Sequence, residues 1–104
     1  MSEPLVIAPS GDIDLGSVAG FQEWLDDAID GSDEGVIIDL TEVSFIDSTG
    51  LRVLVDLNRR LSSEERELAV VAPRGTTAAE VLTLTGLRRG LNVYESARHA
   101  REDG

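Results

Sequence analysis

Four consecutive residues in the middle of the chain have the clearest chemical potential: Asp47, Ser48, Thr49 and Gly50. They separate two apolar runs, so two hydroxyl groups lie beside a carboxylate where one element is expected to end and the next to begin. Three uses fit such a segment. It could hold a nucleophilic serine on a sharp turn, an ordinary helix cap, or a hydroxyl that another protein modifies.

The nucleophilic serine lacks its supporting residues. In the G-x-S-x-G turn of hydrolases a glycine precedes the serine by two positions, and here that position is Ile46. The chain contains no Lys or Cys, and its single histidine, His99, lies in the C-terminal "SARHARED". We therefore expect no catalytic residue and no enzymatic activity.

Four aspartates suggest the only metal site worth considering: Asp12, Asp14, Asp39 and Asp47. A hard cation could bind them weakly if parallel strands bring their loops to one edge of a sheet. Their spacing fixes no coordination geometry, so we expect neither a metal nor a cofactor.

A helix cap explains part of the segment. The apolar positions that follow recur at helical spacing, and Ser48 or Thr49 is expected to be the N-cap of a helix beginning near Gly50. A cap needs one hydroxyl, which leaves the other to face solvent. A phosphate on Ser48 would lie near the free N–H groups of the helix start and add about −1.5 to −2 charges beside Asp47. Such a change would act on a docked partner rather than on the fold.

Strands and helices alternate along the chain in a regular order. The run 36–40 is β-branched and unbroken, as expected of a strand buried on both faces, and Pro4 and Pro9 suit a strand at the sheet edge. Residues 9–14 read as a turn, and Thr76 or Thr77 is expected to cap the third helix. The expected strands span 4–8, 36–40, 67–72 and 91–95, and the expected helices 16–29, 50–61 and 78–85. This order predicts one α/β domain over residues 1–104, with a small, mostly parallel four-stranded sheet flanked by helices.

Charge is distributed unevenly. Residues 1–51 contain 12 acidic side chains and no basic one, while the remainder has 8 acidic side chains and 9 arginines, for a net charge of −11. Nucleic acid is an unexpected partner because its binding depends on neutralising phosphates with Lys and Arg. The acidic half favours a basic protein partner, although acidic side chains also simply keep a small domain in solution.

The location of the protein is predicted from its apolar segments. No apolar run approaches the roughly 18 residues of a membrane span. The N-terminal residues lack the basic start and long apolar middle of a signal peptide. We expect a cytoplasmic protein without membrane association.

Several stretches resemble the STAS domain family and, within it, the bacterial anti-sigma factor antagonists. The similarity runs from about Leu5 to Ala97, in "SGDIDLGSVAGF", "VIIDLTEVSFIDSTGLRVLVDLNRRL", "LAVVAP" and "LTLTGLRRGLNVYESA". The "FIDSTGL" element, residues 45–51, is highly specific in this order and spacing. The resemblance implies a small sheet flanked by helices, which is also what the order of elements predicts.

The resemblance also implies phosphorylation-controlled partner switching. In such proteins the serine that Ser48 matches is phosphorylated by an anti-sigma factor that is itself a serine kinase, and a serine phosphatase reverses the reaction. The unmodified antagonist binds the anti-sigma factor and frees a sigma factor, whereas the phosphorylated form lets go. The resemblance implies a role in partner binding for Asp12, Asp14, Asp47, Thr49 and Gly50.

Three features depart from the family pattern. The N-terminal strand before the "SGDID" turn is short or missing, which leaves an open sheet edge and predicts a monomer or a weak dimer. Arg52 replaces a residue that is often small, one helical turn after Ser48, where it could contact a partner or a phosphate. The C-terminal helix, residues 96–101, looks truncated.

The alternative function is a constitutive STAS scaffold or a subunit of a sensory or lipid-transport assembly. In such a protein the two hydroxyls only cap the helix. The two functions differ in one measurable way, because Ser48→Asp would leave partner affinity unchanged in a scaffold and weaken it in a switch.

Overall fold

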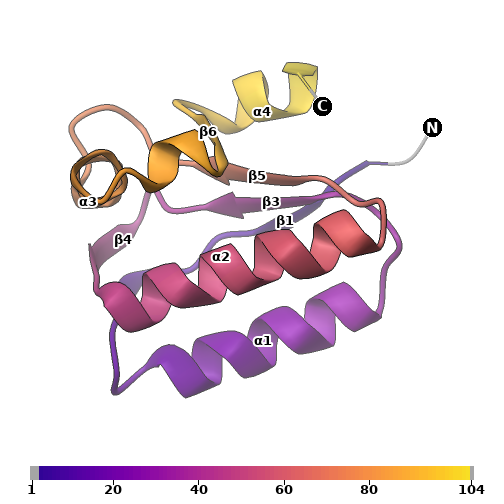
Figure 1. Ribbon diagram of the computed structural model, residues 1–104, viewed down its shortest axis with the longest axis horizontal. Coiled ribbons are helices and arrows are strands. Elements are labelled where there is room, and N and C mark those ends of the chain that lie inside the picture. Colours follow the sequence, from indigo (N-terminus) through magenta and orange to yellow (C-terminus); the bar gives the residue numbers. More distant parts are fainter. Residues whose placement is uncertain (1–2, 104) are drawn as a thin grey trace.

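The computed structural model describes residues 3–103, whose main sheet has four parallel strands in the order β1-β3-β5-β6 (Figure 1). These strands are β1 (Leu5–Ile7), β3 (Val36–Asp39), β5 (Leu68–Val71) and β6 (Asn92–Tyr94). The four-stranded parallel sheet predicted from the sequence is confirmed. The three-residue β1 lies at the edge, where its flanking prolines suit it.

Helices cover both faces of the main sheet. α1 (Val18–Asp30) and α2 (Ser48–Ser63) lie side by side on one face, and α4 (Ala97–Asp103) packs on the other (Figure 1). α3 (Thr77–Leu84) and the short 3-10 helix η1 (Leu87–Arg89) close one end of the main core.

Strand β3 is apolar on both faces because each face meets a different helical layer. Val36 and Ile38 belong to the main core with residues of α1, α2 and α3, while Ile37 packs in a second cluster with Ala100 of α4. None of the three strand residues is more than 2% exposed. The unbroken apolar run is therefore a doubly buried strand, as predicted.

A second, two-stranded sheet corrects the sequence prediction. β2 (Gly11–Ile13) and β4 (Val43–Ile46) pair in parallel, although the sequence predicts a turn over residues 9–14. The strand signal is weak because two of the three β2 residues, Gly11 and Asp12, are common turn formers. The ladder with a distant segment makes β2 a strand, and such tertiary pairing overrides local propensity.

Local hydrogen bonds set the ends of α1 and α3. The Thr76 hydroxyl accepts the Ala79 N–H at 3.2 Å, so Thr76 caps α3 as predicted, and Gly86 follows the end of the helix with φ 75°. α1 begins at Val18, later than predicted, because residues 15–17 form a separate turn.

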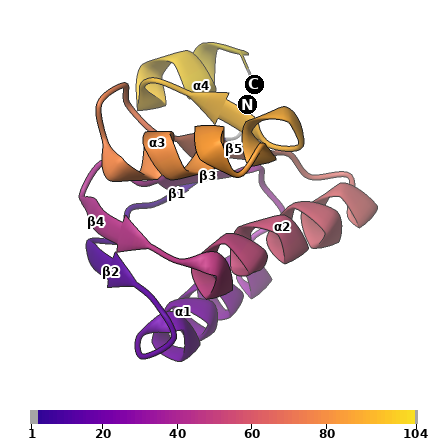
Figure 2. The same ribbon diagram turned by 60° about the vertical axis from the view of Figure 1, so that its left-hand side comes forward.

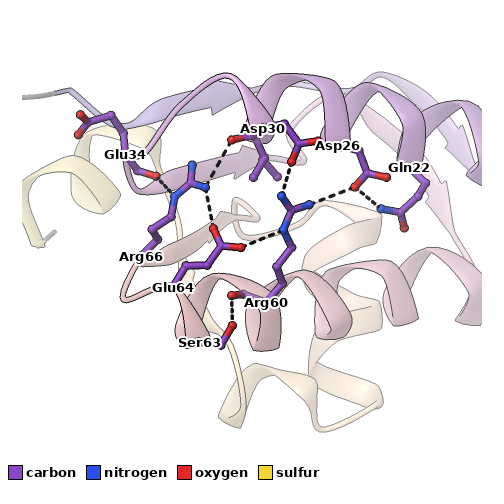
Figure 3. Close-up of polar contacts among 9 residues, drawn as sticks. Gln22, Asp26, Asp30, Glu34, Arg60, Ser63, Glu64 and Arg66 are labelled. Carbon is purple, nitrogen blue, oxygen red and sulfur yellow. Dashed lines mark hydrogen bonds and ion pairs between the residues drawn. The ribbon is translucent and has the colours of Figure 1, made fainter.

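The C-terminal parts of α1 and α2 are joined through Arg60 (Figure 3). This side chain pairs with Asp30, with Asp26 at 3.4 Å and with Glu64 at 3.2 Å. The hydrogen bond to Asp30, followed by that to Glu64, raises the pKa of Arg60 above its usual value. Arg60 thus remains charged and holds the two helices together at the surface.

Arg66, which is largely buried, also makes contacts near the C-terminal ends of α1 and α2. Its side chain is 7% exposed, its Nε donates to the Glu34 carbonyl at 2.7 Å, and one guanidinium nitrogen donates to the Ile29 carbonyl at 3.4 Å (Figure 3). The same nitrogen pairs with Glu64 at 3.1 Å. Arg66 therefore supplies a donor to the Glu34 carbonyl and an additional one to the Ile29 carbonyl, which also accepts the Ser32 N–H at 3.2 Å.

We predict that Arg66→Met lowers the free energy of unfolding by about 1–3 kcal/mol, because the Glu34 carbonyl loses the Arg66 donor and Glu64 loses an ion-pair partner. The matched control is Arg98→Met, since Arg98 is 85% exposed and pairs with Glu102 on its own helix at 3.0 Å; it should change stability by less than about 1 kcal/mol. Urea unfolding at neutral pH measures both. Equal effects of the two substitutions would contradict a structural role for Arg66.

Candidate functional site

The segment around Ser48 lies where two loops leave the small sheet together. β2 and β4 are parallel neighbours, with Ile13 opposite Ile46, and the Asp47 N–H donates to the Ile13 carbonyl at 3.1 Å. Figure 2 shows the two strands side by side, with the chain running from β2 into α1 and from β4 into α2. The β2–α1 loop and the start of α2 therefore form one surface.

Asp47 is the N-cap of α2, which corrects the expectation that Ser48 or Thr49 has this role. Its Oδ1 accepts the N–H of Thr49 at 2.9 Å and that of Gly50 at 3.2 Å. The Thr49 hydroxyl donates to the same Oδ1, so it supports the cap instead of replacing it. A carboxylate outcompetes a hydroxyl here because it is charged and accepts several donors at the positive end of the helix.

The second oxygen of Asp47 reaches the other loop. Oδ2 accepts the Leu15 N–H at 3.2 Å, which ties the β2–α1 loop to the start of α2. The Thr49 hydroxyl is the main cause that lowers the pKa of Asp47 below its usual value, and the N–H groups of Gly50, Thr49 and Leu15 add to this effect. Asp47 is therefore ionised at neutral pH and bonded through both oxygens.

Gly50 is needed because there is no room for a side chain. A Cβ at this position would lie 2.7 Å from Ile13 Cγ2, 2.8 Å from Ile46 Cγ1 and 3.1 Å from the Ile13 carbonyl oxygen. Atoms of this kind do not approach so closely, so α2 can start against the small sheet only with glycine here. Gly50 contributes through packing.

Ser48 is the first residue of α2, and its side chain is exposed. Within the part of the chain that the structure describes, its hydroxyl makes no hydrogen bond, in contrast to the hydroxyl of Thr49. Because Asp47 and Thr49 complete the cap, the Ser48 hydroxyl is available to another molecule.

Asp12 on β2 and Asp14 in the β2–α1 loop differ in what they do. Asp14 Oδ1 accepts the N–H of Gly16 at 3.0 Å and that of Ser17 at 3.1 Å, so its carboxylate shapes the turn before α1. Asp12 is exposed, and its backbone carbonyl accepts the Ser17 hydroxyl at 2.7 Å. Asp14 belongs to the loop that Asp47 holds through Leu15, and Asp12 lies on β2 opposite Phe45.

Arg52 extends into solvent one turn after Ser48. Its side chain is 83% exposed, and its Nε lies 3.8 Å from the Asp56 carboxylate. Ser48 and Arg52 line one shallow groove of about 430 Å³ between α2 and residues 85–87. We call it the α2–η1 groove, and its walls include Ser48, Arg52, Val55, Arg59, Thr85 and Leu87.

Two exposed apolar residues beside this segment are not identified by the sequence reasoning. Leu15 is 77% exposed on the loop that Asp47 fixes, and Phe45 is 46% exposed on β4. A leucine in the polar stretch "DIDLGS" is the signal that could have pointed to the first. Exposed large apolar side chains next to an exposed hydroxyl are typical of a protein-binding surface.

Residues 3–103 contain neither a metal cluster nor a membrane-spanning helix. In that range no group of three or more His, Cys, Asp or Glu side chains is arranged to hold a metal ion. None of the helices there has the length and apolar character needed to cross a bilayer.

Comparison with known proteins assigns the chain to one domain family. The STAS domain family model matches residues 2–100. A protein of Thermotoga maritima described as a putative anti-sigma factor antagonist is 25% identical over 99% of this chain and 91% of its own length. The anti-sigma-F factor antagonist RsfB of Mycobacterium tuberculosis is 26% identical over 91% of this chain and 76% of its own.

A solved structure agrees with the sequence comparison. The crystal structure of a putative anti-sigma factor antagonist from Thermotoga maritima superposes with a TM-score of 0.83. It is 27% identical, and the match covers 94% of this chain and 84% of that one.

The packing around Gly50 predicts that Gly50→Ala destabilises the protein by about 1–3 kcal/mol, because the added methyl group clashes with Ile13 and Ile46. Gly20→Ala is the matched control. Gly20 lies inside α1, and a Cβ added there would have no atom within 4 Å, so this change should be neutral or stabilise by up to about 1 kcal/mol. Urea unfolding compares the two. A Gly50→Ala protein as stable as wild type would show that the start of α2 can move away from Ile13 and Ile46 without loss of stability.

The bonds of Asp47 predict a pH-dependent effect of Asp47→Asn. Because folding lowers the pKa of Asp47, its carboxylate stabilises the fold at neutral pH, and this stabilisation is lost as the pH falls through the folded-state pKa. The stability difference between wild type and Asp47→Asn should therefore be constant near pH 7 and shrink between about pH 5 and pH 2. Urea unfolding across this range provides the measurement.

Asp39→Asn is the control for this experiment. Asp39 Oδ1 also accepts the N–H and hydroxyl of the threonine two positions later, Thr41, but it caps no helix and bonds no distant loop within residues 3–103. At pH 7, Asp39→Asn should lower the free energy of unfolding by less than Asp47→Asn does. A difference for Asp47→Asn that stays the same at every pH would contradict the role assigned to the charge.

Proposed function

The chain belongs to the STAS domain family, and on that premise we propose that it is an anti-sigma factor antagonist controlled by phosphorylation of Ser48. Unphosphorylated, it binds an anti-sigma factor that is a serine kinase and thereby frees a sigma factor. Phosphorylated, it releases the kinase, and a serine phosphatase restores the binding form. The names of the two relatives above support the antagonist role.

The state of the Ser48 hydroxyl is the observation that carries this proposal. The adjacent hydroxyl of Thr49 is committed to Asp47, while the Ser48 hydroxyl is exposed and makes no hydrogen bond to any residue of the described range. A kinase could therefore modify Ser48 without breaking a bond that the fold uses. The same change at Thr49 would remove a donor from the cap of α2.

The phosphate would act mainly through charge. It would add about −1.5 to −2 charges next to the ionised Asp47 and in the half of the sequence that has no basic side chain. Asp12 on β2 and Asp14 in the loop that follows adjoin this segment, so a partner that docks across this surface would meet a much stronger negative potential. The partner would be released by electrostatic repulsion and by the bulk of the phosphate, while the fold of the domain stays unchanged.

The unphosphorylated surface has what a protein partner needs. Leu15 and Phe45 offer apolar contact, and the carboxylates of Asp12, Asp14 and Asp47 complement basic side chains. We propose that these residues, with Thr49 and Arg52, define the binding surface, and that the buried Gly50 contributes to partner binding by letting α2 start against the small sheet. The protein works by binding rather than by turnover, as a single domain in the cytoplasm.

The test begins by isolating the kinase that the unmodified protein binds and adding ATP. We predict one phosphate on wild type and none on Ser48→Ala, as measured by mass spectrometry, while Ser48→Ala still binds. The matched control is Ser44→Ala, because Ser44 is also exposed and lies nearby on β4. It should accept one phosphate as wild type does.

Two results would count against the proposal. Normal incorporation of phosphate into Ser48→Ala would refute the assignment of the site. Ser48→Asp is expected to weaken partner binding at least about tenfold. If its affinity equals that of wild type, the protein is a constitutive STAS scaffold.

A further inference from the structure

The nine arginines fall into two groups according to their partners within residues 3–103. Five form ion pairs at 3.5 Å or less: Arg60, Arg66, Arg74, Arg98 and Arg101. The other four are Arg52, Arg59, Arg88 and Arg89, of which only Arg52 has an ion pair in this range, at 3.8 Å. In a chain with 20 acidic side chains, arginines that are unpaired or, like Arg52, paired only at 3.8 Å are available to an incoming anion.

Two of these four arginines, Arg52 and Arg59, line the α2–η1 groove. Both belong to α2, while Leu87 of η1 lines the groove from the other element. Arg88 and Arg89 follow Leu87 in the chain without lining the groove, and Arg88 lines a separate pocket with Glu80 and Glu95. The positions of Ser48, Arg52 and Arg59 recur at helical spacing, so they lie along one side of α2. All of these arginines are exposed.

The groove also has an apolar component. Val55 and Leu87 are both partly buried, and Leu87 packs against the main core. Leu51, 7% exposed, is a further lining residue. A ligand seated here would meet these apolar side chains as well as guanidinium groups. An amphipathic segment suits this combination better than a simple ion does.

We propose that the α2–η1 groove binds an acidic, partly apolar segment of a protein partner. Carboxylates of that segment pair with Arg52 and Arg59, and an apolar side chain packs against Val55 and Leu87. Arg88 and Arg89 attract the segment through the same charge complementarity.

Nucleic acid fits the same residues less well. The residues that line the groove include no aromatic side chain on which a base could stack, and Asp56 places a carboxylate among them. A polyanion would also extend beyond the four arginines over a protein of net charge −11. A short peptide segment brings only the few charges that the groove can pair.

The groove is linked to phosphorylation because Ser48 lies at its end. This step rests on the proposed function. A phosphate on Ser48 would be one helical turn from Arg52, where it would compete with Asp56 for the guanidinium and repel the carboxylates of the bound segment. One modification would therefore weaken the binding of a partner to the surface of Asp12, Asp14 and Asp47 and also the binding of the acidic segment in the groove.

The probe for this proposal is a synthetic ten-residue peptide of Asp, Glu and Leu, with a matched peptide in which Lys replaces each acidic residue. In ¹⁵N-labelled protein we expect chemical-shift changes at residues 51–59 and 85–89 with the acidic peptide only. Arg52→Gln/Arg59→Gln should weaken its binding about tenfold. Arg74→Gln/Arg98→Gln, which removes two exposed arginines away from the groove, should leave it unchanged.

Several results would overturn the proposal. They are an absence of shifts at these residues with millimolar peptide, equal binding of the Lys peptide, and equal affinity of the two double variants. Tighter binding of a single-stranded oligonucleotide at the same residues would assign the groove to nucleic acid instead.

Protein carrying phosphoserine at position 48 tests the link to Ser48. It should bind the acidic peptide about tenfold more weakly, and unchanged affinity would overturn the coupling. This experiment needs no kinase, so the two proposals fail separately. If the groove binds no peptide, the proposal that Ser48 is phosphorylated is unaffected. If no kinase modifies Ser48, the proposal that the groove binds an acidic peptide is unaffected.

Discussion

The carboxylate of Asp47 is the interaction on which the candidate site depends. It accepts three hydrogen bonds from Thr49 and Gly50 at the start of α2 and a fourth from the Leu15 N–H of the neighbouring loop. The β2–β4 ladder brings these segments together, and Asp47 fixes their relative position. Because one side chain satisfies the helix start and the loop, the Ser48 hydroxyl has no structural task.

Much of this architecture follows from patterns that are local in the sequence. The unbroken run 36–40 must be buried on both sides, and crossover helices between such strands require a parallel sheet. β2 is missed because its identity depends on β4, far along the chain. The N-cap of α2 is missed for another reason: Asp47, Ser48 and Thr49 are all good cap residues, and only the backbone conformation of Asp47, extended at φ −101° and ψ −173°, decides among them.

The surface around Ser48 has both signs of charge, which the totals for the two halves of the sequence conceal. Arg60 and Arg66 neutralise carboxylates where α1 and α2 meet, so these basic residues serve the fold (Figure 3). Arg52 and Arg59 instead line the groove next to Ser48, while Asp12 lies on β2 and Asp14 in the β2–α1 loop. Such a pattern orients a partner, since only one way of docking matches both signs.

The close packing at Gly50 decides how a change at Ser48 could be transmitted. The start of α2 lies so near Ile13 and Ile46 that a single methyl group has no space, and the loop cannot shift inward to accommodate a new group. Asp47 also fixes the β2–α1 loop through its hydrogen bond with the Leu15 N–H. A phosphate on Ser48 would therefore meet a rigid surface and would alter its charge rather than its shape. Under the proposed phosphorylation, regulation would depend on the charge that the partner meets, and the domain itself would need no second conformation.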